Sequence, residues 1–283
     1  RQMCIRDRLV YGYTYASEEL INAVLDWERD EHDYTFDREA LVFIEGVVPA
    51  ISTAIQAFTK DGDAVLINTP VYPPFARSVK LNNRRLITNS LIEQNDLFQI
   101  DFEQLERDIA DNEVKIYVLC NPHNPGGRVW EREVLEKIGR LCQKYGVLLV
   151  SDEIHQDLTL FGHEHQSFNT VSPDFKDFSL ILASATKTFN IAGTKNSYAV
   201  IENVNFVVDY FAKEAPRLRV MKPQGTYLIW LDFSDYGLTD DQLFQLLREE
   251  AKVVLNRGRD FGQEGKGDAR LNVAAPETMV EEI

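Results

Sequence analysis

The chain of 283 residues is long enough for one large domain and a smaller one, and its 44% of apolar residues exclude a wholly disordered protein. Its 45 acidic residues outnumber its 30 basic ones without any lysine and arginine cluster, so we expect neither nucleic acid nor a membrane as a partner. Three cysteines without a CxxC pair, and no apolar run of membrane-spanning length, exclude a disulfide framework, a zinc site and a transmembrane segment. We therefore expect no bound metal. We also expect a cytoplasmic protein, since no hydrophobic signal segment opens the chain.

The first predicted helix is Ser17–His32. Residues 1–10 before it differ in character from the rest of the chain, and we interpret them as a junction segment. Ser17 is suited to cap the helix, and Glu18 and Glu19 suit the positive end of its dipole. Four residues form an apolar stripe at helical spacing: Leu20, Ile21, Val24 and Trp27.

Short apolar strands then alternate with amphipathic helices. The predicted strands are Ala64–Asn68, Arg85–Thr88, Lys115–Cys120, Val147–Ser151, Leu180–Ala183 and Ser197–Ile201. The predicted helices between them are Pro49–Phe58, Pro74–Leu81, Phe102–Ala110 and Glu131–Tyr145. This alternation predicts an α/β large domain with a mainly parallel sheet, over residues 11–205.

The last part of the chain has a different pattern. A strand over Gly225–Phe233 is followed by a helix over Asp240–Lys252 and by short strands at Lys252–Asn256 and Ala269–Val273. These elements predict a smaller α+β domain over residues 206–283.

Polar side chains follow three of the predicted strands. Asn124 lies in NPHNPGG after one strand, Asp152 in SDEIH after the next, and Lys187 in SATK after a third. Because parallel strands place their carboxyl ends at one edge of a sheet, we expect these side chains to converge on a ligand site. Each alone has an ordinary explanation: a turn residue, a helix cap and a surface lysine.

Together and in order, these motifs resemble a known family. NPHNPGGRVW, SDEIHQDL, SATKTFNIAGTKNSYAVIEN, PQGTYLIWLDF and ARLNVA are similar to fold-type I pyridoxal-5′-phosphate (PLP) enzymes of the aminotransferase class I/II superfamily. Within it, RVW after NPHNPGG and the histidine of SDEIH resemble the MalY/PatB group of cystathionine β-lyases. The resemblance runs from about Tyr11 to the C-terminus.

The resemblance implies a role for each residue around the cofactor. Lys187 forms the Schiff base with PLP and removes the Cα proton of the substrate. Asp152 pairs with the pyridinium nitrogen, so that the ring accepts electrons from Cα, and Tyr72 stacks on the ring. Asn124 donates to the phenolic oxygen of the ring, and His155 supports the same side.

The resemblance also implies contacts to the cofactor phosphate and to the substrate. The backbone of Gly46, Val47 and Val48, at the start of a helix, cradles the phosphate. The other phosphate contacts come from Ser184, Lys195 and, from the partner subunit of a homodimer, Tyr13. Arg270, with Asn124, binds the substrate carboxylate.

The function implied is carbon–sulfur β-elimination, which releases a thiol, pyruvate and ammonia from cystathionine or another cysteine S-conjugate. An aminotransferase on the same scaffold is a second hypothesis, and a non-catalytic binding or regulatory protein, or an inactive fragment, is a third. Two differences from the family bear on this choice. By the resemblance, we expect that the N-terminal segment of the family is missing from these residues, and that a stretch that the family carries after Asn203 is shortened to residues 204–224.

Overall fold

The computed structural model describes residues 16–94, 97–194, 196–201, 217–221, 228–249, 255–261 and 266–272. Its helices are α1 (Glu18–His32), α2 (Val47–Phe58), α3 (Pro74–Leu81), α4 (Phe102–Asn112), α5 (Arg132–Tyr145), α6 (Ala185–Thr188) and α8 (Asp240–Glu249). Its strands in the first part of the chain are β1 (Leu41–Ile44), β2 (Ala64–Thr69), β3 (Arg85–Ser90), β4 (Ile92–Gln94), β5 (Leu97–Gln99), β6 (Val114–Cys120), β7 (Leu148–Asp152), β8 (Ser179–Ala183) and β9 (Ser197–Val200). The later strands are β10 (Arg219–Met221), β11 (Leu228–Asp232), β12 (Asn256–Arg257) and β13 (Asp268–Asn272).

A seven-stranded sheet forms the centre of the larger part, in the order β1-β9-β8-β7-β6-β2-β3. The strands from β8 to β3 in this order run parallel, whereas β9 is antiparallel to β8 and β1 is antiparallel to β9. In the register, Asp152 of β7 lies between Cys120 of β6 and Leu182 of β8. The carboxyl ends of these three strands therefore open at one edge, as the sequence predicts.

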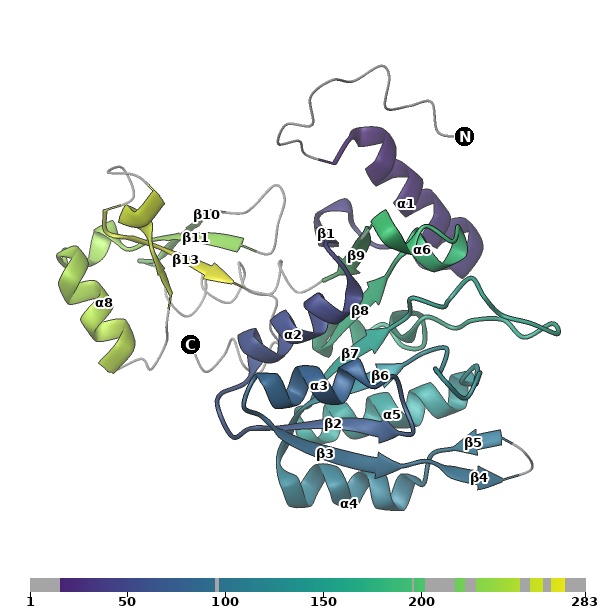
Figure 1. Ribbon diagram of the computed structural model, residues 1–283. Helices are drawn as coiled ribbons and strands as arrows, with labels where there is room; N and C mark the ends of the chain where they lie inside the picture. The colour runs from purple at the N-terminus through teal and green to yellow at the C-terminus, as the bar shows by residue number, and fades with distance from the viewer. Residues whose placement is uncertain are drawn as a thin grey trace.

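Helices cover both faces of this sheet (Figure 1). The side chains of β6 alternate between the two faces: Ile116 and Val118 pack in one apolar cluster with α2 and α3, and Tyr117 and Leu119 in another with α4 and α5. All four are at most 1% exposed, as expected of parallel strands that are covered on both sides.

The C-terminal part forms a four-stranded antiparallel sheet in the order β10-β11-β13-β12. α8 packs on it through Leu243, Phe244 and Leu247 against Ala269. Leu218 and Leu231 belong to the same apolar cluster as α2 and α3. The predicted fold class, a mainly parallel α/β sheet with a smaller α+β unit, is confirmed, while the domain boundaries at residues 10 and 205 stay predictions.

The sequence prediction missed some elements. β1 and the β4–β5 hairpin were not expected, and β12 begins at Asn256, where the predicted strand ends. Ser17 caps α1, as predicted, by accepting a hydrogen bond from the Leu20 N–H at 3.2 Å. Among the described residues, no helix is both long and apolar enough to cross a membrane.

Candidate active site

A cavity of about 510 Å³ opens at the carboxyl ends of β6, β7 and β8. Many of the predicted site residues line it together: Gly46, Val47, Val48, Tyr72, Asn124, Asp152, His155 and Lys187. Cys120, Thr186 and Ser197, which the sequence prediction did not name, also line it. Cys120 and Thr186 could have been predicted from the sequence, because each lies close to the carboxyl end of a predicted strand.

Asp152 ends β7 and lies on the cavity floor with 4% of its surface exposed. Burial raises its pKa to about 7, and the charge of Glu153 acts in the same direction. The Ile154 N–H, which donates to Asp152 Oδ1 at 3.1 Å, and the Lys187 ammonium act against that rise in pKa. This carboxyl group therefore needs a cationic partner in the cavity to be fully ionised at neutral pH.

Lys187 stands on α6, the short helix that follows β8, and its side chain lines the cavity. Lys187 is exposed. Its charge acts to lower the pKa of two ionisable neighbours, Asp152 and His155. An accessible amine beside a buried carboxylic acid is available to react with a carbonyl group.

The first turn of α2 supplies backbone donors. Gly46 is its N-cap residue, no side chain caps the helix, and its first turn holds no acidic residue. The N–H groups of Val47 and Val48 therefore have no partner within the helix, which suits an anion. Gly46 has φ 156° and ψ 155°, a backbone conformation that is essentially restricted to glycine.

Three further side chains complete the cavity wall. Tyr72 is 39% exposed and presents its ring beside Phe75, at 6.1 Å between ring centroids. Asn124 is fixed through its backbone N–H, which donates to Cys120 Sγ at 3.3 Å. Burial and the Lys187 charge lower the pKa of His155, so its imidazole is neutral at pH 7.

Ser184 is not among the residues that line the cavity, and its predicted contact to the cofactor phosphate stays a prediction. It is the N-cap of α6, accepts a hydrogen bond from the Thr186 N–H at 3.1 Å and donates to the Asn196 carbonyl at 2.5 Å. Its hydroxyl proton is therefore already used to hold the Lys187 turn.

Three predicted residues fall outside the described part of the structure. They are Tyr13, Lys195 and the side chain of Arg270, whose backbone pairs with Trp230 between β13 and β11. Their predicted roles stay predictions.

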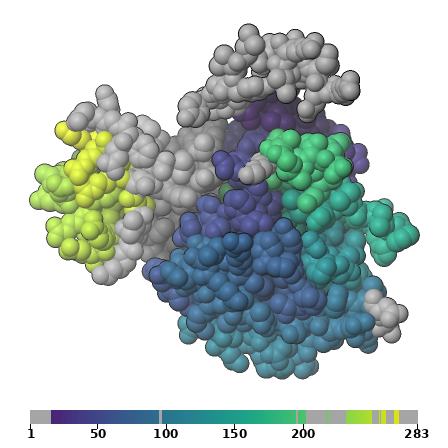
Figure 2. Space-filling model, in the orientation of Figure 1, coloured from purple at the N-terminus to yellow at the C-terminus, as the bar shows by residue number. Residues whose placement is uncertain are grey.

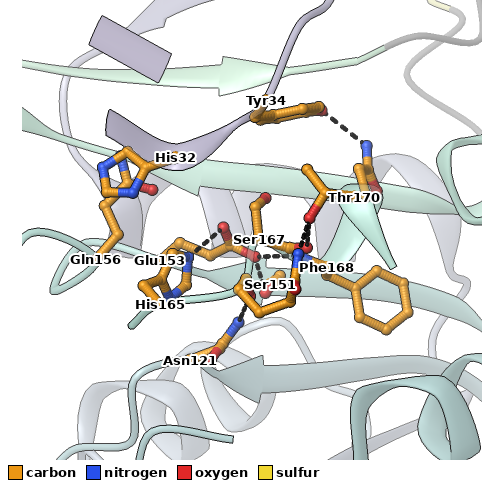
Figure 3. A network of polar contacts seen from close by, with 12 residues as sticks. His32, Tyr34, Asn121, Ser151, Glu153, Gln156, His165, Ser167, Phe168 and Thr170 are labelled. Atoms are coloured by element: carbon orange, nitrogen blue, oxygen red, sulfur yellow. Dashed lines mark hydrogen bonds and ion pairs between the residues drawn. The ribbon is translucent and has the colours of Figure 1, made fainter. Parts of the chain in front are cut away.

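A buried polar network surrounds Glu153, the residue that follows Asp152 (Figure 3). Glu153 accepts hydrogen bonds from the Ser151 hydroxyl at 2.8 Å and the Phe168 N–H at 2.9 Å, and its carboxylate lies 3.0 Å from His165 Nε2. Burial raises the pKa of Glu153, but the charge and hydrogen bond of His165 outweigh it, and the pKa is lowered. His165 was not among the predicted site residues, and its side chain is 1% exposed.

The comparison with known proteins settles the family. The model of the family "Aminotransferase class I and II" matches residues 4–203 and 193–283. The chain belongs to the aminotransferase class I and II family.

Two curated members of this family illustrate the similarity. Cystathionine beta-lyase PatB of Bacillus subtilis is 38% identical over 314 aligned residues, which cover 94% of this chain and 81% of that protein. Protein MalY of Escherichia coli is 29% identical, over 96% of this chain and 82% of that protein. The predicted resemblance to the MalY/PatB group is confirmed.

Solved structures of the family agree with the fold. Cystalysin from Treponema denticola, whose structure contains pyridoxal 5′-phosphate, matches with a TM-score of 0.68 and 31% identity over 98% of this chain and 82% of that one. A PLP-bound C–S lyase from Staphylococcus hominis matches with a TM-score of 0.67 and 27% identity, over 98% and 84% of the two chains.

The predicted internal shortening is also supported within the family. The alignment with PatB spans 314 positions, more than the 283 residues of this chain, so PatB carries residues in the aligned region that this chain lacks. The two matches of the family model meet at residues 193–203, next to the predicted gap after Asn203.

Proposed function

We propose that the chain is a PLP-dependent carbon–sulfur β-lyase, which releases a thiol, pyruvate and ammonia from a cysteine S-conjugate such as cystathionine. The observation that carries the proposal is the meeting of Lys187, Asp152 and the uncapped start of α2 around one cavity. The similarity to PatB, MalY and a C–S lyase supports this reaction.

The residues present fit PLP as the cofactor. Free N–H groups at α2 suit its phosphate, the buried Asp152 suits a protonated ring nitrogen, and the exposed Lys187 suits its aldehyde. When bound, PLP supplies an electron sink for the electron pair left on the substrate Cα.

The chain's own residues would then hold and move protons. The Lys187 amine, once free, takes the proton from the substrate Cα. The Asp152 carboxylate keeps a proton on the ring nitrogen, and that cation in turn stabilises its charge against burial. Tyr72 would cover the ring, and Asn124 and the neutral His155 would hold its oxygen side. Arg270 would hold the substrate carboxylate, and Lys195 would add a positive charge at the phosphate.

The assembly and location that we propose are a homodimer and the cytoplasm. A homodimer, in which Tyr13 reaches the phosphate of the partner subunit, would close the site. We place the enzyme in the cytoplasm, because Cys120 and Cys142 are free, buried thiols, as is usual in a reducing compartment.

The first test is the visible absorption spectrum of the chain with PLP, beside the Lys187→Ala and Lys187→Arg variants. We expect a band in the violet region for the parent that is lost in both variants. Pyruvate release from L-cystathionine should fall by at least ~100-fold in both, since the proton acceptor is removed. A parent without the band, or a Lys187→Ala protein that releases pyruvate at the parental rate, would contradict the proposal.

An aminotransferase remains the second candidate. Aspartate aminotransferase of Geobacillus stearothermophilus is 27% identical over 88% of this chain. The two reactions separate by amino acceptor, because a lyase releases pyruvate and ammonia without a keto acid. Product formation that requires a keto acid would favour the aminotransferase.

A further inference from the structure

A second cavity, of about 590 Å³, adjoins the candidate active site. It shares Asn124 and His155 with the first cavity, so both spaces open onto the same two side chains. We call it the side groove. Its walls come from the turn after β6, from Leu97 of β5, and from residues 158–163, the loop that follows β7. Figure 2 shows this loop standing out at the right edge of the molecule.

The walls of the side groove are apolar. Leu97, Val129, Leu158, Leu160 and Phe161 line it. Leu160 is 65% exposed and Phe161 97% exposed, although burial of such side chains is normally favoured. Phe161 also has φ 57°, which bulky residues rarely adopt. Large apolar side chains held open beside a reactive site indicate a surface that a ligand covers.

Charge in the side groove decides which ligand fits. Of the described residues that line it, none is Lys, Arg, Asp or Glu. His155 at its entrance is neutral at pH 7, because burial and Lys187 lower its pKa. Two further histidines line the groove, His123 and His163, and burial lowers the pKa of His123. A carboxylate at the far end of a substrate would therefore find no lysine or arginine partner among these residues. An uncharged, apolar group would lose nothing and would cover the exposed leucines.

We propose that the side groove binds the S-substituent of the substrate and selects cysteine conjugates with an uncharged, apolar substituent. This inference rests on the proposed function, since it places the departing thiol of that reaction. Asn124 and His155 then mark the passage from the reacting atoms to the groove. The preferred substrate class is thereby S-aralkyl and S-alkyl cysteines rather than cystathionine, whose far end carries charge.

Binding tests the groove without any turnover. 2-Amino-5-phenylpentanoate has the shape of S-benzylcysteine but no leaving group, and norvaline lacks only its ring. We expect calorimetric titration of the PLP-loaded chain to give a dissociation constant at least ~10-fold lower for the phenyl compound, as an apolar contact of this size provides. Equal affinities, or no binding of either compound, would overturn the inference.

Matched variants locate the effect. Leu160→Ala and Phe161→Ala should each reduce the affinity ratio by about 3-fold or more. Leu81→Ala is the control, because Leu81 is 70% exposed but does not line the groove, and it should leave the ratio unchanged. An unchanged ratio in both groove variants, with a shift in sedimentation instead, would overturn the inference and assign the surface to a second copy of the chain.

Pyruvate release distinguishes a failure of the groove assignment from a failure of the lyase reaction. We expect kcat/KM for S-benzyl-L-cysteine to exceed that for S-methyl-L-cysteine and for L-cystathionine by about 10-fold. If no cysteine conjugate yields pyruvate while the phenyl compound still binds more tightly than norvaline, the lyase reaction is wrong and the groove is still a binding site for the substrate side chain. If all three conjugates react equally well, the lyase stands and the groove assignment falls.

Discussion

Asp152 is an acid in a position where water cannot stabilise its charge. Burial raises its pKa to about 7 from an ordinary 3.8, so without a cofactor its ionisation disfavours folding above that pH. The folded state binds the proton more tightly than the unfolded state, and stability is therefore gained as the pH falls through 7. The cost at pH 8 is on the order of 4 kcal/mol, as an upper limit.

We accordingly expect Asp152→Asn to stabilise the PLP-free chain at pH 8. Urea unfolding of the parent and the variant at pH 8 and pH 5 measures this. The variant should gain a few kcal/mol at pH 8, and most of the difference should vanish by pH 5. A variant that is less stable than the parent at pH 8 would show that Asp152 already has a cationic partner in the folded chain.

A substitution at Gly46 tests whether the start of α2 binds the cofactor phosphate. Its φ of 156° would strain any residue with a Cβ atom, although the space around it is ordinary, with Pro49 Cδ at 3.4 Å. Gly46→Ala should lower the free energy of unfolding by about 1–3 kcal/mol and weaken PLP binding, since Val47 and Val48 must shift. Gly193→Ala is the control, because it has no positive φ and nothing within 4 Å. Unchanged PLP titrations for Gly46→Ala would remove α2 from the phosphate site.

Between elements, Asp157 joins α1 to the turn that carries Lys187. Its carboxylate accepts hydrogen bonds from the Trp27 indole at 2.9 Å and from the Thr188 hydroxyl, and it lies 2.7 Å from His32 Nε2. Trp27 also packs edge-on against Phe189, at 5.8 Å. Because Thr188 and Phe189 follow Lys187 directly, α1 holds the turn on which the amine stands.

The stability from this contact depends on pH with a definite sign. Burial lowers the pKa of His32, but the Asp157 hydrogen bond and the nearby carboxylates outweigh it and raise the pKa. Burial raises the pKa of Asp157, but hydrogen bonds from His32, Thr188 and Trp27 outweigh it and lower the pKa. The His32 contribution is therefore complete below pH 6.5 and lost as the pH rises through its folded pKa, and the Asp157 contribution is lost only as the solution becomes strongly acidic.

We expect Asp157→Asn to lower the free energy of unfolding by about 3 kcal/mol near pH 5.5 and by less at pH 8. Unfolding by urea at the two pH values checks this, and Asp30→Asn, which affects an exposed pair with Arg29, should change little at either. The Asp157→Asn variant should also slow capture of PLP by Lys187. A destabilisation that is equal at both pH values would show that only the hydrogen bonds matter.

Some residues of the site could be predicted from the sequence, and other features could not. Asn124, Asp152 and Lys187 were predictable together because each follows an apolar strand, and neighbouring parallel strands bring such positions to one edge. The cap that Ser184 forms on α6 was not predicted, because spacing locates a serine but not the direction of its hydroxyl. β1 was missed because its four residues pair with β9, more than 150 residues later. His165 gave no signal, because the sequence does not show that its side chain pairs with Glu153 inside the fold.

Taken as a whole, the molecule has an apolar groove close to the predicted internal gap. The groove, of about 310 Å³, runs between α2 and the edge of the large sheet, and is lined by Phe43, Ala54, Phe58, Leu182 and Ile201 among others. Ile201 follows β9 directly, so the residues that PatB carries and this chain lacks would leave the sheet beside it. Apolar surface of this kind weakens a fold through its contact with water.

We therefore expect a chimera, in which the corresponding PatB segment replaces residues 204–216, to bind less of an apolar fluorescent dye than the parent. Its urea midpoint should rise, because the added apolar side chains would cover the partly exposed Phe43 and Ile44 at about 25 cal/mol per Å² of apolar surface buried. A glycine–serine segment of equal length is the control. It should neither reduce dye binding nor raise the urea midpoint, since it adds chain length without apolar surface. Equal dye binding by all three proteins would mean that the groove is already covered in the present chain, and that the shortened segment costs the fold nothing at this face.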